Sequence, residues 1–155
     1  MDKYSWVDIG SSFLANEITA AFLYAQLERA DELTKRRVEL WNIYCERLEP
    51  LERQGKLARP APVPGCEHNG HIFWIHLNDT EARDSLAASL KARGIGTAFH
   101  YVPLHGAPMG SRFSAKKLPM AEEYANRLLR LPLFHELTPE EIAHVTDAII
   151  WNLNG

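Results

Sequence analysis

The sequence predicts a mixed α/β fold, in which a small sheet of about three strands is covered by helices and one long helix leads away. Runs rich in β-branched and aromatic residues, typical of strands, alternate with helical patterns. In addition, residues 18–27 are apolar on nearly every side of a predicted helix, and such helices are normally buried on nearly every side. We therefore expect this helix to pack between other protein layers.

The helical pattern begins near Asn16 or Ser12, either of which can cap it, and continues to about Glu49. After residue 30 it becomes one-sided, with apolar residues at helical spacing: Leu33, Leu40, Tyr44, Leu48 and Leu51. Pro50 cannot donate a hydrogen bond and is expected to end or restart the helix. The predicted organisation is an extended arm (residues 1–15), a connecting helix or helix pair (16–54) and a small α/β domain (55–155).

The small domain starts with a proline-rich extended connector, Arg59–Gly65. His71–Leu77 is a predicted strand. Asp79 or Thr80 should cap a helix that runs to about Arg93, with Leu86, Ala87 and Leu90 inward, and Gly94 provides a left-handed stop. Gly96–Val102 is the second predicted strand.

The remaining elements follow a loop over Pro103–Leu118. A helix is predicted over Pro119–Arg130, and a short edge strand over Leu131–Leu133, because Pro132 lacks an N–H for the ladder. Thr138–Glu141 is a capping box with proline at the first helical position. It opens a last helix to about Asn152, with Ile142, Val145, Ile149 and Ile150 inward.

Composition excludes some classes of function. Hydrophobic content is 46%, charged content is 24% and net charge is −3, so a surface for nucleic acid or anionic membrane is not expected. The apolar helix is too short to span a bilayer. The first ten residues lack a basic start followed by an apolar core, so we expect a cytoplasmic protein with Cys45 and Cys66 as free thiols.

Histidine is abundant, but its spacing does not favour a metal site. The seven are His68, His71, His76, His100, His105, His135 and His144. No H-E-x-x-H or C-x-x-C motif occurs, and residues 71 and 76 would point to opposite faces of one strand. We expect no metal, and scattered structural or surface histidines.

Two stretches are candidates for binding. His100, Tyr101 and His105 lie where a predicted strand leaves for a loop, so they can face a cleft, unless Tyr101 packs in the core and His100 is a structural strand residue. Gly10–Ser12 precedes a helix start, where exposed N–H groups suit an anion such as phosphate. From spacing alone, an ordinary N-cap is the favoured interpretation there.

Three segments, in order along the chain, resemble the sugar aminotransferases of the DegT/DnrJ/EryC1/StrS family. They are DIGSSFLANEITAAFLYAQLERAD, GIGTAFHYVPLH (Gly94–His105) and LLRLPLFHELTPEEI (Leu128–Ile142). The first matches the family pattern at Gly10, Glu17, Ala20, Ala21, Gln26, Leu27 and Asp31. Because family members are more than twice this length, the chain resembles their C-terminal portion, and its arm looks severed from the larger cofactor domain.

The resemblance implies the C-terminal domain of a fold-type I enzyme, a homodimer that uses pyridoxal phosphate. Such an enzyme would transfer an amino group from glutamate to a 4-keto sugar on dTDP. It implies that Ser12, at a position usually held by asparagine, contacts the cofactor phosphate of the neighbouring subunit, although Leu14 replaces the usual arginine. It also implies that His100, Tyr101 and His105 lie near the sugar nucleotide.

No residue of this chain is expected to be catalytic. The Schiff-base lysine of the family precedes a T-x-G-E-G-G-like stretch, which is absent here, so the chain alone should be inactive and should not hold the cofactor stably. The alternative is a non-catalytic fragment or interaction domain that self-associates through its apolar helix. An unrelated small α/β binding module would require all three matches to be accidental.

Overall fold

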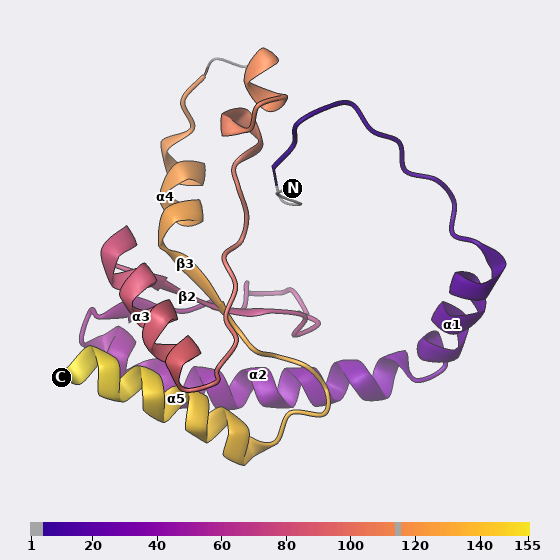
Figure 1. Cartoon of the computed structure of the whole chain (residues 1–155). Helices are drawn as coiled ribbons and strands as arrows, with labels where there is room; N and C mark the ends of the chain where they lie inside the picture. The colour runs from indigo at the N-terminus through magenta and orange to yellow at the C-terminus, as the bar shows by residue number, and fades with distance from the viewer. Residues whose placement is uncertain (1–4, 114–115) are drawn as a thin grey trace.

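A three-stranded antiparallel sheet with helices packed around it forms the body of the protein (Figure 1). The structure is a computed structural model that describes residues 5–113 and 116–155. In chain order its elements are α1 (Glu17–Leu27), α2 (Ala30–Arg53), β1 (Leu57–Ala58), β2 (Phe73–Leu77), α3 (Thr80–Ala92), the 3₁₀ turns η1 (Leu104–Gly106) and η2 (Gly110–Arg112), α4 (Pro119–Arg127), β3 (Leu128–Leu131) and α5 (Pro139–Asn154). The mixed α/β fold with a small sheet is confirmed.

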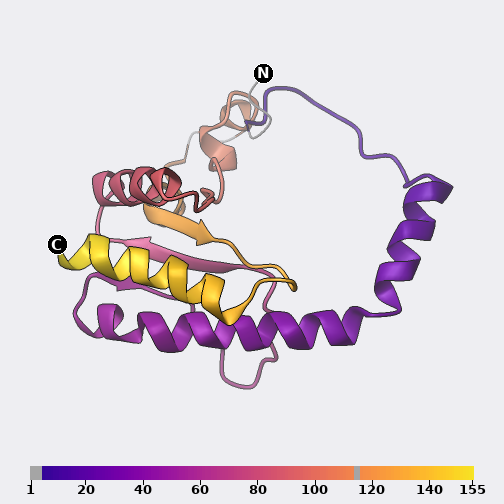
Figure 2. The same ribbon diagram turned by 60° about the horizontal axis from the view of Figure 1, so that its bottom comes forward.

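The core lies on one face of the sheet. Residues of β2 alternate between buried and half-buried, so that Phe73, Ile75 and Leu77 point into the core. The ring of Tyr44, on α2, stacks on Phe73 with centroids 4.9 Å apart. Helix α5 packs along α2, and both contribute to the same apolar cluster. Figure 2 shows α2 and α5 running side by side against the sheet.

The predicted connecting helix is a pair of helices, because a two-residue turn at Glu28 and Arg29 separates α1 from α2. Asn16 caps α1 by accepting a hydrogen bond from the Thr19 N–H, at 2.9 Å. None of the α1 residues is buried, and Figures 1 and 2 both show this helix standing away from the sheet. A nearly all-apolar helix is therefore left open to solvent in this chain.

The expected end of the long helix at Pro50 is wrong. Helix α2 continues through Pro50 to Arg53 and stops before Gly55, whose φ of +70° is left-handed. Leu48 and Leu51, on either side of the proline, are both buried. Packing of these two leucines favours helical backbone there, and Pro50 itself is exposed, so only one backbone hydrogen bond is lost.

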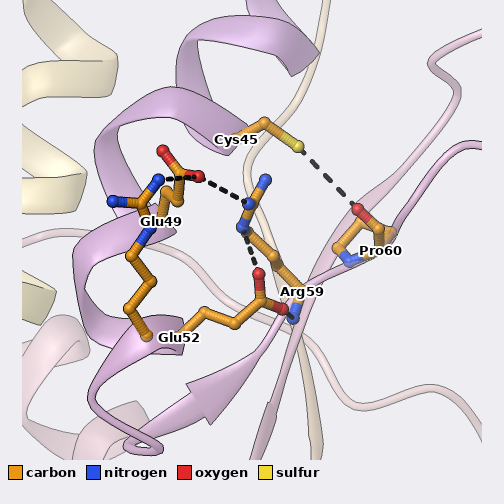
Figure 3. Close-up of polar contacts among 6 residues, drawn as sticks. Cys45, Glu49, Glu52, Arg59 and Pro60 are labelled. Atoms are coloured by element: carbon orange, nitrogen blue, oxygen red, sulfur yellow. Dashed lines mark hydrogen bonds and ion pairs between the residues drawn. The ribbon is translucent and has the colours of Figure 1, made fainter.

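Beyond α2, Arg59 fastens the proline-rich connector to the helix (Figure 3). Its Nε lies 2.8 Å from a carboxylate oxygen of Glu52, an ion pair without hydrogen-bond geometry, and its backbone N–H donates to the other oxygen at 3.1 Å. Cys45, a free thiol like Cys66, lies 3.8 Å from the Pro60 carbonyl. Burial raises the pKa of the Cys45 thiol, which keeps it protonated.

Two expectations about strands are corrected, and one strand was not expected. The segment Gly96–Val102 is not a strand, and only Ala98 forms a bridge, to Arg130. The helix predicted over Pro119–Arg130 ends at Arg127, because Leu128–Leu131 pair with β2 as strand β3. The edge strand expected over Leu131–Leu133 therefore lies three residues earlier, although it is at an edge of the sheet as expected. Strand β1, only two residues long, was not predicted. In each case pairing with distant residues, rather than local preference, decides the structure.

Capping residues and a left-handed glycine mark the remaining helix ends, as the sequence predicted. Asp79 caps α3, Gly94 has a φ of +77°, and Thr138 and Glu141 form both hydrogen bonds of the capping box at the start of α5. Within the described residues, no helix combines the length and apolarity needed to cross a membrane.

Protonation of His76 is expected to destabilise the fold. Burial lowers the pKa of His76, and smaller effects come from Glu123, which raises it, and Arg127, which lowers it. Its Nε2 atom is buried and has no hydrogen-bond partner among the described residues. Because the folded pKa lies below the unfolded value of about 6.5, the stabilising contribution is complete above that pH and is lost as pH falls towards the folded pKa.

Urea unfolding above and below about pH 6.5 tests whether protonation of His76 destabilises the fold. His76→Gln should reduce the loss of unfolding free energy on acidification, whereas His144→Gln, an exposed control on α5, should leave it nearly unchanged. An equal pH dependence in all three proteins would show that His76 is not responsible.

Candidate functional site

The clearest group of polar side chains lies at the β3 edge of the sheet. Ala98 and Arg130 exchange two backbone hydrogen bonds, of 2.7 and 3.1 Å, which bring the segment after α3 alongside β3. His100 and Tyr101 follow two and three residues after Ala98, and their ring centroids lie 4.2 Å apart. This pairing places His100, Tyr101 and Arg130 together although thirty residues separate them in sequence.

Arg130 holds this group together. Its Nη1 lies 3.4 Å from Nδ1 of His100 and donates to the hydroxyl of Tyr101 at 3.2 Å. Burial lowers the pKa of His100, and the positive charges of Arg130 and His71 lower it further. His100 is therefore held neutral near pH 7, with one ring nitrogen available to accept a hydrogen bond.

A cavity of about 230 Å³ borders this group. It is lined by residues from the segment before β2, the segment after α3 and the end of β3, among them His71, Thr97 and Arg130. None of the nine lining residues is acidic. A small polar or anionic group therefore fits the cavity better than a cation does.

The structure does not bring His105 into this group. His105 lies on η1, half-buried, with Nε2 3.1 Å from a carboxylate oxygen of Glu122 on α4. This contact fastens the 3₁₀ turn to the helix, so the side chain has a structural partner here. The three residues proposed for the substrate thus divide into a pair, His100 and Tyr101, and a separate His105–Glu122 contact.

Ser12 lies in the extended segment before α1. It is exposed, and among the residues that the structure describes it has no hydrogen-bond partner. The N-cap of α1 is Asn16, so Ser12 does not take the capping role that spacing favoured. Its hydroxyl is free to contact something outside this chain.

Arg130 is the residue that sequence reasoning missed. The predicted helix over Pro119–Arg130 placed it on a helix end, where a basic residue is unremarkable. The available signal was the run L-L-R-L, in which one charge interrupts a short apolar segment, as on the less buried face of a strand. Among the described residues, no three potential metal ligands gather.

Comparison with known proteins gives a consistent result. Residues 1–150 match the family described as the DegT/DnrJ/EryC1/StrS aminotransferase family. A relative from Saccharopolyspora spinosa, dTDP-4-dehydro-2,3,6-trideoxy-D-glucose 4-aminotransferase, is 35% identical over 141 residues, which are 90% of this chain and 35% of the relative.

Solved structures agree with this match. DesV of S. venezuelae, in complex with a ketimine intermediate, superimposes with a TM-score of 0.77 and 32% identity, over 97% of this chain and 40% of DesV. The aminotransferase TlmJ of Streptoalloteichus hindustanus gives a TM-score of 0.80 and 29% identity, over 91% of this chain and 37% of TlmJ. In all three comparisons this chain spans well under half of the relative's length.

Proposed function

Because this chain belongs to the DegT/DnrJ/EryC1/StrS aminotransferase family, we propose that it is the C-terminal part of a pyridoxal-phosphate-dependent sugar aminotransferase. The intact enzyme transfers the amino group of glutamate to the keto carbon of dTDP-4-keto-6-deoxyglucose. The products are dTDP-4-amino-4,6-dideoxygalactose, a precursor for enterobacterial common antigen or related lipopolysaccharide, and 2-oxoglutarate. The main support is the family match over residues 1–150, together with the identity to a dTDP-keto-sugar 4-aminotransferase.

In this proposal the chain supplies one wall of the substrate cleft. His100 and Tyr101 contact the sugar nucleotide directly, and His105 supports the turn that follows them. Ser12, exposed on the arm, contacts the cofactor phosphate in the partner subunit of a homodimer. We place the enzyme in the cytoplasm.

The residues of this chain do not by themselves complete a cofactor site. When bound, pyridoxal phosphate provides the electron sink for amino-group transfer, and it needs a lysine to carry it. No lysine lines the cavity beside His100 and Arg130. Lys56 is engaged at the end of α5, where its ammonium donates to the Leu153 carbonyl at 2.8 Å. In this proposal the lysine comes from the larger domain.

The chain alone is expected not to bind pyridoxal phosphate covalently. A lysine needs a desolvated or charge-tuned setting to react selectively, and Lys35, Lys91 and Lys117 are exposed. Mixing with the cofactor, reduction with borohydride and mass spectrometry should show no stoichiometric adduct. One lysine labelled in full would contradict this expectation.

A chimera tests the proposed activity. This chain replaces the segment of the Saccharopolyspora spinosa aminotransferase that aligns with it, and the rest of that protein is kept. Purified chimera should convert dTDP-4-keto-6-deoxyglucose and glutamate into amino sugar and 2-oxoglutarate, detected by mass spectrometry. A folded, cofactor-loaded chimera that accepts no keto-sugar nucleotide would overturn the proposal.

His105→Ala in the same chimera is expected to lower turnover or substrate affinity by about tenfold, as for loss of one hydrogen bond to a charged group. The reason is that His105 anchors η1 to α4 and so positions the segment that begins at His100. Steady-state kinetics and thermal unfolding are measured together. A loss of stability at unchanged activity would assign His105 a structural role only.

A second candidate function rests on the exposure of α1. If this chain acts without a cofactor domain, it is a non-catalytic domain that associates with another copy through α1. Phe22 and Ile18 on this helix are 73% and 75% exposed, and neighbouring Leu14 is 99% exposed. Apolar patches of this kind usually mark interfaces.

A further inference from the structure

Three basic side chains from three separate segments gather beside the 230 Å³ cavity at the β3 edge. Arg130 lies on β3, His100 follows α3, and His71 precedes β2. Arg130 and His71 both line the cavity, and Arg130 reaches His100 at 3.4 Å. The three-segment origin means that the folded sheet, and not a local run of basic residues, creates this cluster.

Within residues 5–113 and 116–155, no acidic side chain forms an ion pair with Arg130. In the described part of the chain, no carboxylate oxygen lies within 4.0 Å of the Arg130 guanidinium. Other arginines differ: Arg47, Arg53 and Arg127 each pair with a carboxylate at 2.6–3.0 Å. A half-buried guanidinium beside two histidines and without a counter-ion favours the binding of an anion.

Arg130 also keeps hydrogen-bond donors free. Both of its side-chain hydrogen-bond contacts, to His100 and Tyr101, use Nη1, and the guanidinium carbon lies 6.0 Å from the centre of the Tyr101 ring. Among the described residues, Nε and Nη2 have no partner, and neither atom is buried. The Nε–H and Nη2–H groups form the fork that binds two oxygens of a carboxylate or phosphate at once. The contacts at Nη1 hold the guanidinium in place.

We propose that Arg130, with His100 and His71, forms a binding site for an oxyanion, either a carboxylate or a phosphate group. The cavity is large enough for such a group and several waters, since one water takes up roughly 30 Å³ in the liquid. Thr97, which also lines the cavity, adds a hydroxyl donor.

The source of the oxyanion rests on the proposed function, which offers two: a carboxylate of the amino donor and the diphosphate of the nucleotide sugar. Both have paired oxygens that match the guanidinium fork. Bound anion would also stabilise protonated His100, reversing the effect that Arg130 and His71 exert in its absence. A ligand-induced rise in the His100 pKa is therefore a signature that a purely structural Arg130 would not produce.

The experiment uses this chain alone, so its result does not depend on the chimera assay. Inorganic phosphate, glutamate and dTDP are titrated separately at millimolar concentrations, and histidine side chains are followed by NMR. We expect binding that shifts His100 and His71 and raises the His100 pKa. Arg130→Gln should weaken it by about tenfold or more, and Arg130→Lys by less. The hydrogen bonds between Ala98 and Arg130 involve backbone atoms only. Neither substitution removes them, so both variants should keep the fold.

Arg53→Gln is the matched control, an exposed arginine on α2 that pairs with Glu49. Binding of glutamate but not of phosphate or dTDP would identify the oxyanion as the carboxylate of the amino donor. Binding of phosphate and dTDP but not of glutamate would identify it as the diphosphate of the nucleotide sugar. Absence of binding by all three ligands would overturn the proposal. So would equal weakening by Arg130→Gln and Arg53→Gln, because that result indicates non-specific charge attraction.

Discussion

Phe73→Ala is expected to lower the free energy of unfolding by about 3–5 kcal/mol, the usual cost of removing a buried aromatic ring. Phe73 is fully buried in the middle of the core, where β2 meets α2. Its ring stacks on Tyr44 and meets the edge of Trp41 at a centroid distance of 5.4 Å. Truncation leaves a cavity between β2 and α2.

Urea denaturation measures this effect through the shift in midpoint at constant slope. Because whole domains are stable by only about 5–15 kcal/mol, the variant should be close to unfolded at elevated temperature. Phe134→Ala is the control, since Phe134 lies on a loop and is 47% exposed, and its cost should be clearly smaller. Equal losses in the two variants would mean that the packing of α2 on β2 does not dominate stability.

Elements specified by short local patterns were predicted from the sequence. The alternation in β2, the Asp79 cap of α3 and the capping box of α5 each depend on residues within a few positions of one another. The whole of each signal is therefore present in a short stretch of sequence. The sequence therefore predicted the existence and type of these elements, with small differences at their ends.

Elements that depend on distant partners were predicted poorly. Leu128–Leu131 become a strand because β2 offers them a partner, whereas Gly96–Val102 lack a continuous partner and form a bridge at Ala98 only. Helix α2 passes Pro50 because leucines on both sides pack into the core. Local propensity contains none of this information, since it does not describe tertiary contacts.

The candidate site shows the same division. The sequence placed His100 and Tyr101 at the end of a strand, whereas the structure has only an isolated bridge at Ala98 in this segment. Their contact with Arg130 could not be predicted, because it requires the pairing of Ala98 with β3. His105 was grouped with them by proximity in sequence, but its nearest polar partner is Glu122, seventeen residues later.

The second large effect concerns association: we expect the isolated chain to form a dimer through α1. Exposed leucine and phenylalanine side chains forgo roughly 1.5–3 kcal/mol each relative to burial. On α1, Phe22, Leu23 and Leu27 are 73%, 56% and 58% exposed, and none of the helix is covered by the sheet. Closed two-fold pairs dominate among homo-oligomers, so a dimer is the expected assembly.

Sedimentation of the unmodified chain at micromolar concentration should show this dimer, and Leu23→Glu should dissociate it by placing a charge in the apolar contact. Val63→Glu is the matched control, because Val63 is 64% exposed on the proline-rich connector. It should leave the assembly intact. The amides of α1 should be protected from hydrogen exchange in the dimer and exchange rapidly in the Leu23→Glu monomer, because nothing else in the described chain buries this helix. A monodisperse wild-type monomer with protected α1 amides would contradict the prediction, since it would mean that the chain covers the helix by itself.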